Sequence, residues 1–456
     1  MHTRAIVDPD LAVKLSGKKG RNTFGVMLAS DSGPGNFVGD ERLNPNNLRF
    51  LDRNAHIGVL RLKRDIGKEN SLGIMATSYN FIQKHNDVLG FDGRFRLNNQ
   101  TTYTFQLLGT TSRNHFFNAE EGVSRYRTGN GFGYMTAYNV SGRNWGWELY
   151  GEGFTRDYRA DVGFFRRTNS NFNSFYLRYR SDPKPKQKLI SYYLRQFTHF
   201  QYDWQGRLYT WETEVLAELN LRRSSWIGVS WEPAYERLFE HEFGPTRTAT
   251  RPGTFFGPDN ERSSRKNHFF VFAGSNFSKK LQFNARGVYR MGHFDLDFGN
   301  GRKYPRVSPG ALLLGPNAPH DPGRGDLFEL SGSLTYQPTN ELRMSFNLIK
   351  NRLKRYDTGR TAFDVNIITF RGTYQFTRAT FARAIFDYNT LNSRLRSQVL
   401  AGWTPSPGTS FYVGYNDDLS YNELHPFTRQ IVPGFRRNSR TFFVKISYLL
   451  RKSFGG

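Results

Sequence analysis

Cysteine is absent from this chain of 456 residues, and only 37% of its residues are hydrophobic. The lack of cysteine excludes disulfide cross-links, thiolate metal sites and cysteine catalysis. The longest apolar runs, such as Ala311-Leu312-Leu313-Leu314, fall far short of the roughly 20 residues that a membrane-spanning helix requires. A membrane β-barrel is not excluded in this way, because its strands are apolar only at alternate positions.

Aromatic residues and glycine are abundant by contrast, with 41 Phe, 24 Tyr and 44 Gly. This composition suits aromatic strands joined by glycine turns better than helices. Lys and Arg (64) outnumber Asp and Glu (39), which gives a net charge of +25. Neither a change in composition nor a Pro/Ser-rich linker divides the chain, so we predict a single domain over residues 1–456.

Strict alternation of apolar and polar residues recurs along the chain. Residues 441–451 place Phe442, Val444, Ile446, Tyr448 and Leu450 on one face, and residues 89–98, 281–290, 328–336 and 342–348 follow the same period of two. Alternation of this length predicts strands with one apolar and one polar face. Their length of roughly 10–14 residues, with aromatics near the strand ends, favours a membrane barrel over a soluble sandwich.

Short and long connections alternate between the expected strands. Tight links are expected near 17–20, 98–100, 142–144, 278–280, 338–341, 377–378 and 406–408, and long stretches near 32–54, 113–130, 157–169, 239–263, 295–325 and 420–438. Outer-membrane barrels combine short periplasmic turns with long extracellular loops. We therefore predict an all-β fold, a transmembrane up-and-down antiparallel β-barrel of about 20–22 strands.

The number of strands bears on how the barrel closes. About 21 strands can be counted, whereas bacterial single-chain barrels normally have an even number. We expect the first strand to be incomplete, so that an upstream strand or an N-terminal module on a separate or cleaved chain completes the barrel. The first residues, Met1-His2-Thr3-Arg4, also lack the apolar core of a secretion signal, as expected for a trimmed form of an exported protein.

Several segments together resemble a family of large bacterial outer-membrane barrels of unknown function. They are residues 11–18 (LAVKLSGK) with 24–29 (FGVMLA), 59–66 (VLRLKRDI) with 71–77 (SLGIMAT), 161–168 (DVGFFRRT) and 438–451. The resemblance implies a barrel in the bacterial outer membrane. Members of that family usually carry an N-terminal module similar to a family-nine carbohydrate-binding domain, and no segment here matches that module.

Basic residues fall on the polar face of the predicted strands. The lumen-lining candidates are Arg94, Arg96, Arg286, Arg290, Arg343, Arg371, Arg383 and Lys445. They could attract anions or form a ladder of salt bridges with lumenal acids such as Asp92, Glu329 and Asp387. The segment 162–167 interrupts the strand pattern where an outer loop is expected. Its residues Phe164, Phe165, Arg166 and Arg167 are candidates for a constriction at the barrel mouth, the alternative being a strand end with packed phenylalanines.

Signatures of enzymes are missing from the sequence. No His-Glu-x-x-His, phosphate-binding loop, Gly-x-Ser-x-Gly elbow or dinucleotide fingerprint occurs, so we predict no enzyme, no catalytic residue, no cofactor and no metal. Glu240-His241-Glu242 offers metal ligands and Asp295–Asn300 offers oxygen donors for calcium, but neither set is complete. No nucleic-acid-binding module is present.

Three functions are compatible with these features. The leading hypothesis is an outer-membrane channel or transport protein for small polar or anionic solutes, with saccharides suggested by the companion module of the resembling family. The alternative is a non-conducting barrel that anchors or threads a partner protein, either plugging the lumen or bound at the surface. A hydrolase with its site on the loops is the weakest. The expected surroundings are outer-membrane lipid and lipopolysaccharide.

Overall fold

The computed structural model describes residues 6–33, 53–164, 167–301, 303–422 and 432–449. These residues form 21 strands, one short α-helix and one turn of 3-10 helix. No helix in the described ranges has the length and apolarity to cross a membrane. The chain divides into two compact units, the first comprising Met1–Arg180, Leu194–Val215 and Ala234–Ser263, and the second Ser181–Tyr193, Leu216–Pro233 and Ser264–Gly456.

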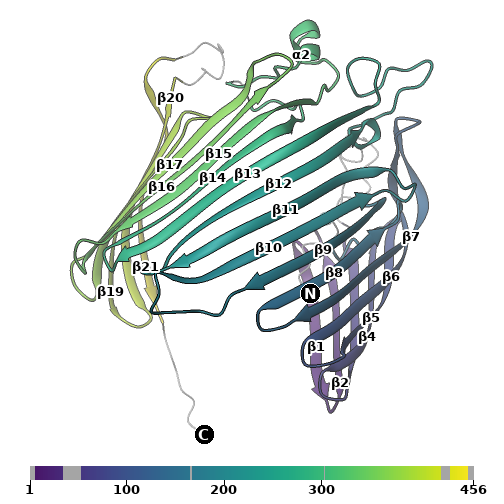
Figure 1. Cartoon of the computed structure of the whole chain (residues 1–456), viewed down its shortest axis with the longest axis horizontal. Helices are drawn as coiled ribbons and strands as arrows, with labels where there is room; N and C mark the ends of the chain where they lie inside the picture. The colour runs from purple at the N-terminus through teal and green to yellow at the C-terminus, as the bar shows by residue number, and fades with distance from the viewer. Residues whose placement is uncertain (1–5, 34–52, 165–166, 302, 423–431, 450–456) are drawn as a thin grey trace. The chain divides into compact units, whose positions relative to one another are not determined.

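The first unit is built on nine strands that neighbour one another in chain order (Figure 1). They are β1 (Pro9–Lys19), β2 (Asn22–Asp31), β3 (Ala55–Ile66), β4 (Asn70–Phe81), β5 (Lys84–Arg96), β6 (Thr101–Asn118), β7 (Val123–Ser141), β8 (Trp145–Phe154) and β9 (Ser170–Arg180). Each strand pairs antiparallel with the next, from β1–β2 to β8–β9.

Three further strands, each divided between the units, are β10 (Leu189–Tyr202), β11 (Leu208–Leu221) and β12 (Ser225–Phe239), followed by the 3-10 turn η2 (Glu240–Glu242). The second unit contains β13 (Glu261–Ser278), most of which lies in this unit, β14 (Leu281–Asp295), α2 (Pro309–Leu314), β15 (Gly323–Tyr336), β16 (Leu342–Arg355), β17 (Thr361–Gln375), β18 (Thr380–Asn389), β19 (Arg394–Ser406), β20 (Thr409–Tyr421) and β21 (Phe435–Tyr448). Strands β13 to β21 again pair antiparallel in chain order. The prediction of an all-β, up-and-down antiparallel fold with about 20–22 strands is therefore confirmed.

The strand register sorts the side chains of each unit into an apolar face and a polar face. One row across β14–β18 pairs Phe283, Leu334, Phe346, Phe370 and Phe386 in turn. The adjacent row is Asn284, Ser333, Asn347, Thr369 and Asp387. Because side chains alternate across a sheet, the first row lies on the apolar face and the second on the polar face.

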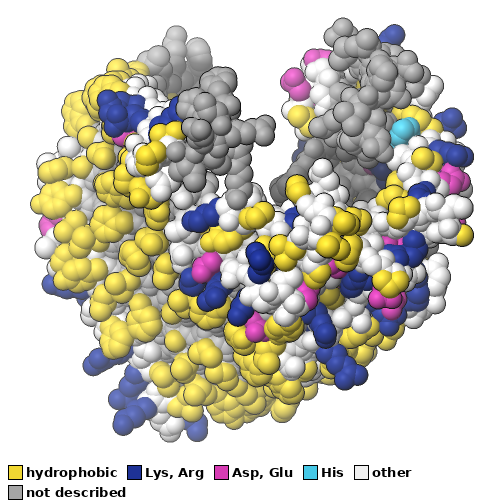
Figure 2. All heavy atoms as spheres, turned by 90° about the horizontal axis from the view of Figure 1, so that it is seen from above, with side chains coloured by type: hydrophobic (Ala, Val, Ile, Leu, Met, Phe, Trp, Pro, Cys, Tyr) yellow, Lys and Arg dark blue, Asp and Glu magenta, His cyan; other side chains and the backbone are white. Residues whose placement is uncertain are grey.

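Exposure is the reverse of that in a soluble protein. On β5 the apolar-face side chain of Leu89 is 63% exposed, whereas Asn86 and Ser112, on the polar faces of β5 and β6, are 0% exposed. Large hydrophobic side chains are exposed along strands of both units, and Figure 2 shows hydrophobic side chains over wide areas of the strand surface. A face of this kind requires an apolar environment.

The connections largely follow the predicted alternation. Short turns occur at residues 97–100, 142–144, 279–280 and 407–408, and long connections at 155–169 and 296–322. The expected long loop at 113–130 is wrong, because β6 and β7 continue through it and leave only residues 119–122 as a turn. Most of the expected loop at 32–54 lies outside the described residues. The expectations of a single domain and of an upstream strand stay predictions.

Candidate functional site

The eight lumen-lining candidates all occur on strands whose neighbours on the apolar face are exposed. Arg94 and Arg96 lie on β5, Arg286 and Arg290 on β14, Arg343 on β16, Arg371 on β17, Arg383 on β18 and Lys445 on β21. The register places them on the polar face, for example Arg371 opposite Ser345 and Arg343 opposite Thr373.

Two of the eight are held by acids. Arg290 Nε donates to Glu329 Oε2 at 2.9 Å, and Arg96 forms an ion pair with Glu69 beside the turn after β5. Arg286 and Arg383 lie over the rings of Phe270 and Phe381 instead. The remaining four candidates, Arg94, Arg343, Arg371 and Lys445, have no ion-pair partner within the described ranges of their own unit. A salt-bridge ladder therefore accounts for a minority of these charges.

The predicted mouth segment is a connection between β8 and β9, as its break in the strand pattern indicated. Val162 is fully buried in a cluster with Ala29, Ile57, Tyr79 and other residues of β2–β4, whereas Phe164 is 85% exposed. Phe165 and Arg166 lie outside the described residues. The buried residue of this segment is therefore Val162, and Phe164 is not packed.

The polar face of β5–β7 receives this connection. Asn86 Nδ2 donates to the carbonyl of Arg159 at 2.9 Å, and the backbone N–H of Asp161 donates to Asn86 Oδ1 at 2.8 Å. Tyr158 is buried against Gly131 and Gly133, and burial raises the pKa of its phenol to about 12. The loop is therefore fixed on the polar face rather than projecting from the strand ends.

Alternate glycines on β7 make this approach possible. A Cβ added at Gly131 would lie 2.6 Å from the backbone nitrogen of Tyr158, and one at Gly129 would lie 3.2 Å from Asp157 Cβ. The third glycine, Gly133, lies beside the ring of Tyr158. Glycine within a strand commonly marks such a close approach of another segment. We call Gly129, Gly131 and Gly133 the glycine track.

Beside the glycine track lies a cavity of about 920 Å³, which we call the mouth pocket. It belongs entirely to the first unit and is formed by the β6–β7 hairpin and the connections after β8, β10 and β12. Its cationic lining residues are Arg127, Arg156, Arg167 and Arg207, and its aromatic ones are Phe116, Phe117, Tyr209 and Phe239. Of the mouth candidates in the described ranges, Arg167 reaches this pocket and Phe164 does not.

Three of the arginines are fixed in the same manner, each between an aromatic ring and a carboxylate. The guanidinium carbon of Arg127 lies 4.4 Å from the Phe116 ring centre, and both terminal nitrogens donate to Asp157 at 2.8 Å. Arg167 lies 3.8 Å over the Tyr209 ring and pairs with Glu242.

Arg207 completes this set of three. Its guanidinium lies 4.4 Å from the ring centre of Phe239, and its Nε donates to Asp203 Oδ2 at 2.6 Å. Because guanidinium carries five N–H donors, one carboxylate leaves several of them available. The pocket therefore presents donors whose positions are set before any ligand arrives.

Glu240-His241-Glu242 forms part of the pocket wall, and its acids are already occupied. Glu240 accepts from Arg247 Nη2 at 2.8 Å and from the backbone N–H of Phe255 at 2.9 Å. Although burial acts to raise it, these hydrogen bonds hold the pKa of Glu240 below its ordinary value. Glu242 pairs with Arg167. A metal is thus disfavoured at this motif.

His241 lies in a positive field. Burial lowers the pKa of its imidazole, and the charges of Arg207, Arg156 and Arg167 lower it further, against an opposing effect of Asp203. At neutral pH the ring is therefore uncharged and can donate one hydrogen bond while accepting another.

The sequence interpretation missed Arg156, Arg207 and Tyr209. Arg156 lies in the connection after β8, whereas Arg207 directly precedes β11 and Tyr209 lies at its start, so no spacing in the sequence relates Arg156 to the other two. The one available signal was the pattern Gly129-Asn130-Gly131-Phe132-Gly133, whose first two residues fall in the long loop expected at 113–130.

The two aspartates of the segment Asp295–Asn300, which offered oxygen donors for calcium, are paired with arginine side chains. Asp295 accepts from Arg355 Nη1 at 2.8 Å, and Asp297 accepts from Arg306 Nη2 at 2.6 Å. Both carboxylates are therefore engaged in ion pairs that hold the connection between β14 and β15.

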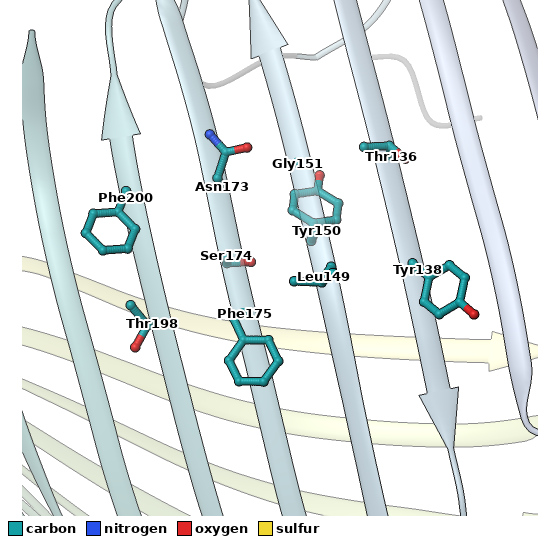
Figure 3. Close-up of a pocket in the computed structure, with 10 residues that line it drawn as sticks. All are labelled: Thr136, Tyr138, Leu149, Tyr150, Gly151, Asn173, Ser174, Phe175, Thr198 and Phe200. Atoms are coloured by element: carbon teal, nitrogen blue, oxygen red, sulfur yellow. The ribbon is translucent and has the colours of Figure 1, made fainter. Parts of the chain in front are cut away.

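A second hollow of about 380 Å³ opens on the apolar face of β7–β10 (Figure 3). It is formed over Gly151 by larger side chains that include Tyr138, Leu149, Phe175 and Phe200. Leu149 and Phe175 pair across β8 and β9 on the face whose hydrophobic side chains are exposed. Because the hollow lies on the face that requires an apolar environment, it is a poor candidate for a polar-solute site.

Comparisons with known proteins give distant structural likenesses only. No protein-family model matches the chain, and no curated protein matches it in sequence. A ferric enterobactin receptor from Pseudomonas aeruginosa is similar over 96% of this chain and 77% of its own, with 10% identity and a TM-score of 0.49. A siderophore receptor from the same organism covers 97% and 78%, with 11% identity and a TM-score of 0.47. A copper transporter covers 98% and 81%, with 10% identity and a TM-score of 0.47. Likenesses at this level carry no statement about what this chain binds.

Proposed function

We propose that the chain is a bacterial outer-membrane β-barrel transport protein for small polar or anionic solutes. The observation that carries the proposal is the sorting of side chains along the strands, with exposed hydrophobic side chains on one face and a row of polar side chains on the other. Lipid satisfies the first face and an aqueous lumen the second. The sequence resemblance to the outer-membrane barrel family supports the same location and adds saccharides to the candidate solutes.

The basic residues of the polar face support a preference for anions. Arg94, Arg343, Arg371 and Lys445 are without ion-pair partners in the described parts of their units, so their charges are not cancelled locally. Fixed positive charge along a polar passage raises the concentration of anions in it and lowers that of cations.

The connection after β8 favours a narrowed passage over a wide pore. Residues 158–162 occupy part of the polar face of β5–β7 and of the cluster on β2–β4. Complete occlusion would instead favour the scaffold function, in which the barrel anchors a partner without conducting.

Conductance through a planar lipid bilayer tests the proposal. The full chain, reconstituted under a KCl gradient, should give discrete current steps with a reversal potential displaced towards that of chloride. Absence of current from protein that resists denaturation at room temperature would favour the scaffold. A reversal potential on the potassium side would overturn the anion preference.

A further inference from the structure

The mouth pocket has an arrangement of charge that the strands alone do not explain. Arg156, Arg167 and Arg207 lie in different parts of two connections, yet all three act on the imidazole of His241. Like charges repel, so bringing three guanidinium groups together costs free energy unless carboxylates or a bound anion offset it.

The carboxylates of the pocket offset only part of this charge. Arg167 is paired with Glu242 through one terminal nitrogen, and Arg207 with Asp203 through Nε. Arg156 is exposed and has no hydrogen bond to any residue in the described ranges. The remaining donors of Arg167 and Arg207 belong to side chains already ordered by Tyr209 and Phe239, so a ligand would lose little further side-chain entropy on binding these two.

An unused acceptor lies beside these donors. Asn169, which lines the same pocket, donates from Nδ2 towards Gln205 Oε1 at 3.4 Å, whereas its Oδ1 is buried without a hydrogen-bond partner among the described residues. A buried acceptor without a donor is costly and is usually satisfied by water or a ligand. A hydroxyl or amine of a bound solute would satisfy it.

We propose that the mouth pocket binds a hydroxylated organic anion, with its phosphoryl or carboxylate group among Arg156, Arg167, Arg207 and His241 and a hydroxyl donating to Asn169 Oδ1. Arginine suits this role because its planar fork matches the oxygens of both oxyanions. The biological use of this site rests on the proposed transport function. Binding in the pocket does not, since it can be measured without any pore.

Equilibrium binding to the full chain in detergent micelles tests the site, with inorganic phosphate, acetate, glucose 6-phosphate and maltose as probes. Phosphate and glucose 6-phosphate should bind, and acetate identifies the preferred oxyanion. Maltose, which is neutral, should bind at least tenfold more weakly than glucose 6-phosphate. Equal affinity for the two sugars would overturn the proposal.

Substitutions then locate the binding to the pocket. Arg156→Gln and Arg167→Gln should each weaken phosphate binding about tenfold, the loss of one charge-assisted contact. The matched control is Arg113→Gln, since Arg113 is an exposed arginine of β6 outside the pocket. Arg156 is exposed, so its variant is expected to fold even where Arg167→Gln does not. Unchanged affinity in folded Arg156→Gln would overturn the proposal.

The hydroxyl contact has its own variant. Asn169 has a φ of 51°, so Asn169→Gly removes the side chain without straining the backbone. Asn169→Gly should weaken the binding of glucose 6-phosphate severalfold and leave the binding of inorganic phosphate nearly unchanged. An equal loss for both probes would refute the contact to Asn169.

Lipopolysaccharide is another source of phosphate, so its binding must be measured separately. Lipopolysaccharide phosphates can also meet basic loops at the membrane surface, where Arg113→Gln should matter as much as Arg156→Gln. Binding of lipopolysaccharide without binding of inorganic phosphate would overturn a solute site. A closed pore with intact phosphate binding would refute the transport function and leave the site standing.

Discussion

Two groups of charged loop residues, one in each unit, are used in different ways. In the second unit, the connection between β14 and β15 is organised by ion pairs that engage Asp295, Asp297, Arg306 and Arg355 with one another and with nearby carbonyl groups. In the first unit, the arginines of the mouth pocket each retain unused donors, and Arg156 pairs with no acid among the residues that the structure describes. The comparison teaches that a buried arginine such as Arg355, engaged through all three of its nitrogens, serves the fold, whereas a fixed arginine with spare donors is available to a ligand.

Loss of Arg355 should have the largest effect on stability. Its side chain is fully buried and donates to Asp295, to both oxygens of Asp357 and to the carbonyl of Asp321. Arg355→Ala should lower the free energy of unfolding by about 3–5 kcal/mol, because it leaves the buried carboxylate of Asp295 without its cationic partner. Urea unfolding from lipid vesicles measures this change.

The control for this variant is Arg360→Ala, at an exposed position in the turn after β16. It should change the free energy of unfolding by less than about 0.5 kcal/mol, as surface substitutions commonly do. Equal effects of the two variants would mean that an arginine whose donors are all engaged contributes no more to stability than an exposed one.

The next largest effect is expected from introducing a charge on the apolar face of the strands, compared with the same charge on the polar face. Leu334→Arg places a charge on the apolar face between Phe283 and Phe346, and should cost about 2–4 kcal/mol if that face meets the centre of a bilayer. Ser333→Arg, one residue away on the polar face, should be tolerated. Band shift on unheated gels reports assembly, and equal losses would mean that the assignment of the faces is wrong.

Much of this strand architecture could be predicted from the sequence. The alternation from Phe442 to Tyr448 lies within β21, and the tight turns at 142–144 and 279–280 occur as expected. Alternation is local, because each side chain's face follows from its position in the strand.

The mouth pocket could not be predicted in the same way. It requires Arg156, Arg207 and His241 to approach from connections far apart in sequence, and long-range meetings leave no periodic signal. The error at 113–130 has a related cause. Gly129 falls in the expected loop, whereas Gly129 and Gly131 are both strand residues, and their lack of side chains allows the chain near Tyr158 to pack on them.

The glycine track gives a third test, which separates the fold of the mouth from its charge. Gly131→Ala places a methyl group against the backbone of Tyr158, where no flexible side chain can move away. Overpacking of this kind costs about 1–3 kcal/mol and should displace the connection from the polar face. We expect a larger single-channel conductance if residues 158–162 narrow the passage.

A matched glycine on the neighbouring strand controls for the backbone effect. An added Cβ at Gly109 of β6 meets no atom within 4 Å. Gly109→Ala should therefore leave both stability and conductance near those of the original chain. Unchanged conductance in Gly131→Ala, with the connection shown to have moved by limited proteolysis, would mean that it does not constrict the passage.

The smallest expected effect is the dependence of anion binding on pH through His241. The pKa of this imidazole lies below the ordinary value of 6.5 because of burial and of Arg207, Arg156 and Arg167. An anion bound beside the ring stabilises its protonated form and so raises that pKa, which couples binding to proton uptake. Affinity should therefore be lowest at alkaline pH and rise as the pH falls through the range in which the bound ring takes up its proton. Sulfate is the suitable probe because its own charge does not change in this range.

His241→Gln should abolish the rise in affinity while keeping the affinity at neutral pH within about twofold, since glutamine also offers a donor and an acceptor. The same rise in both proteins would assign the proton to another group and remove His241 from the site.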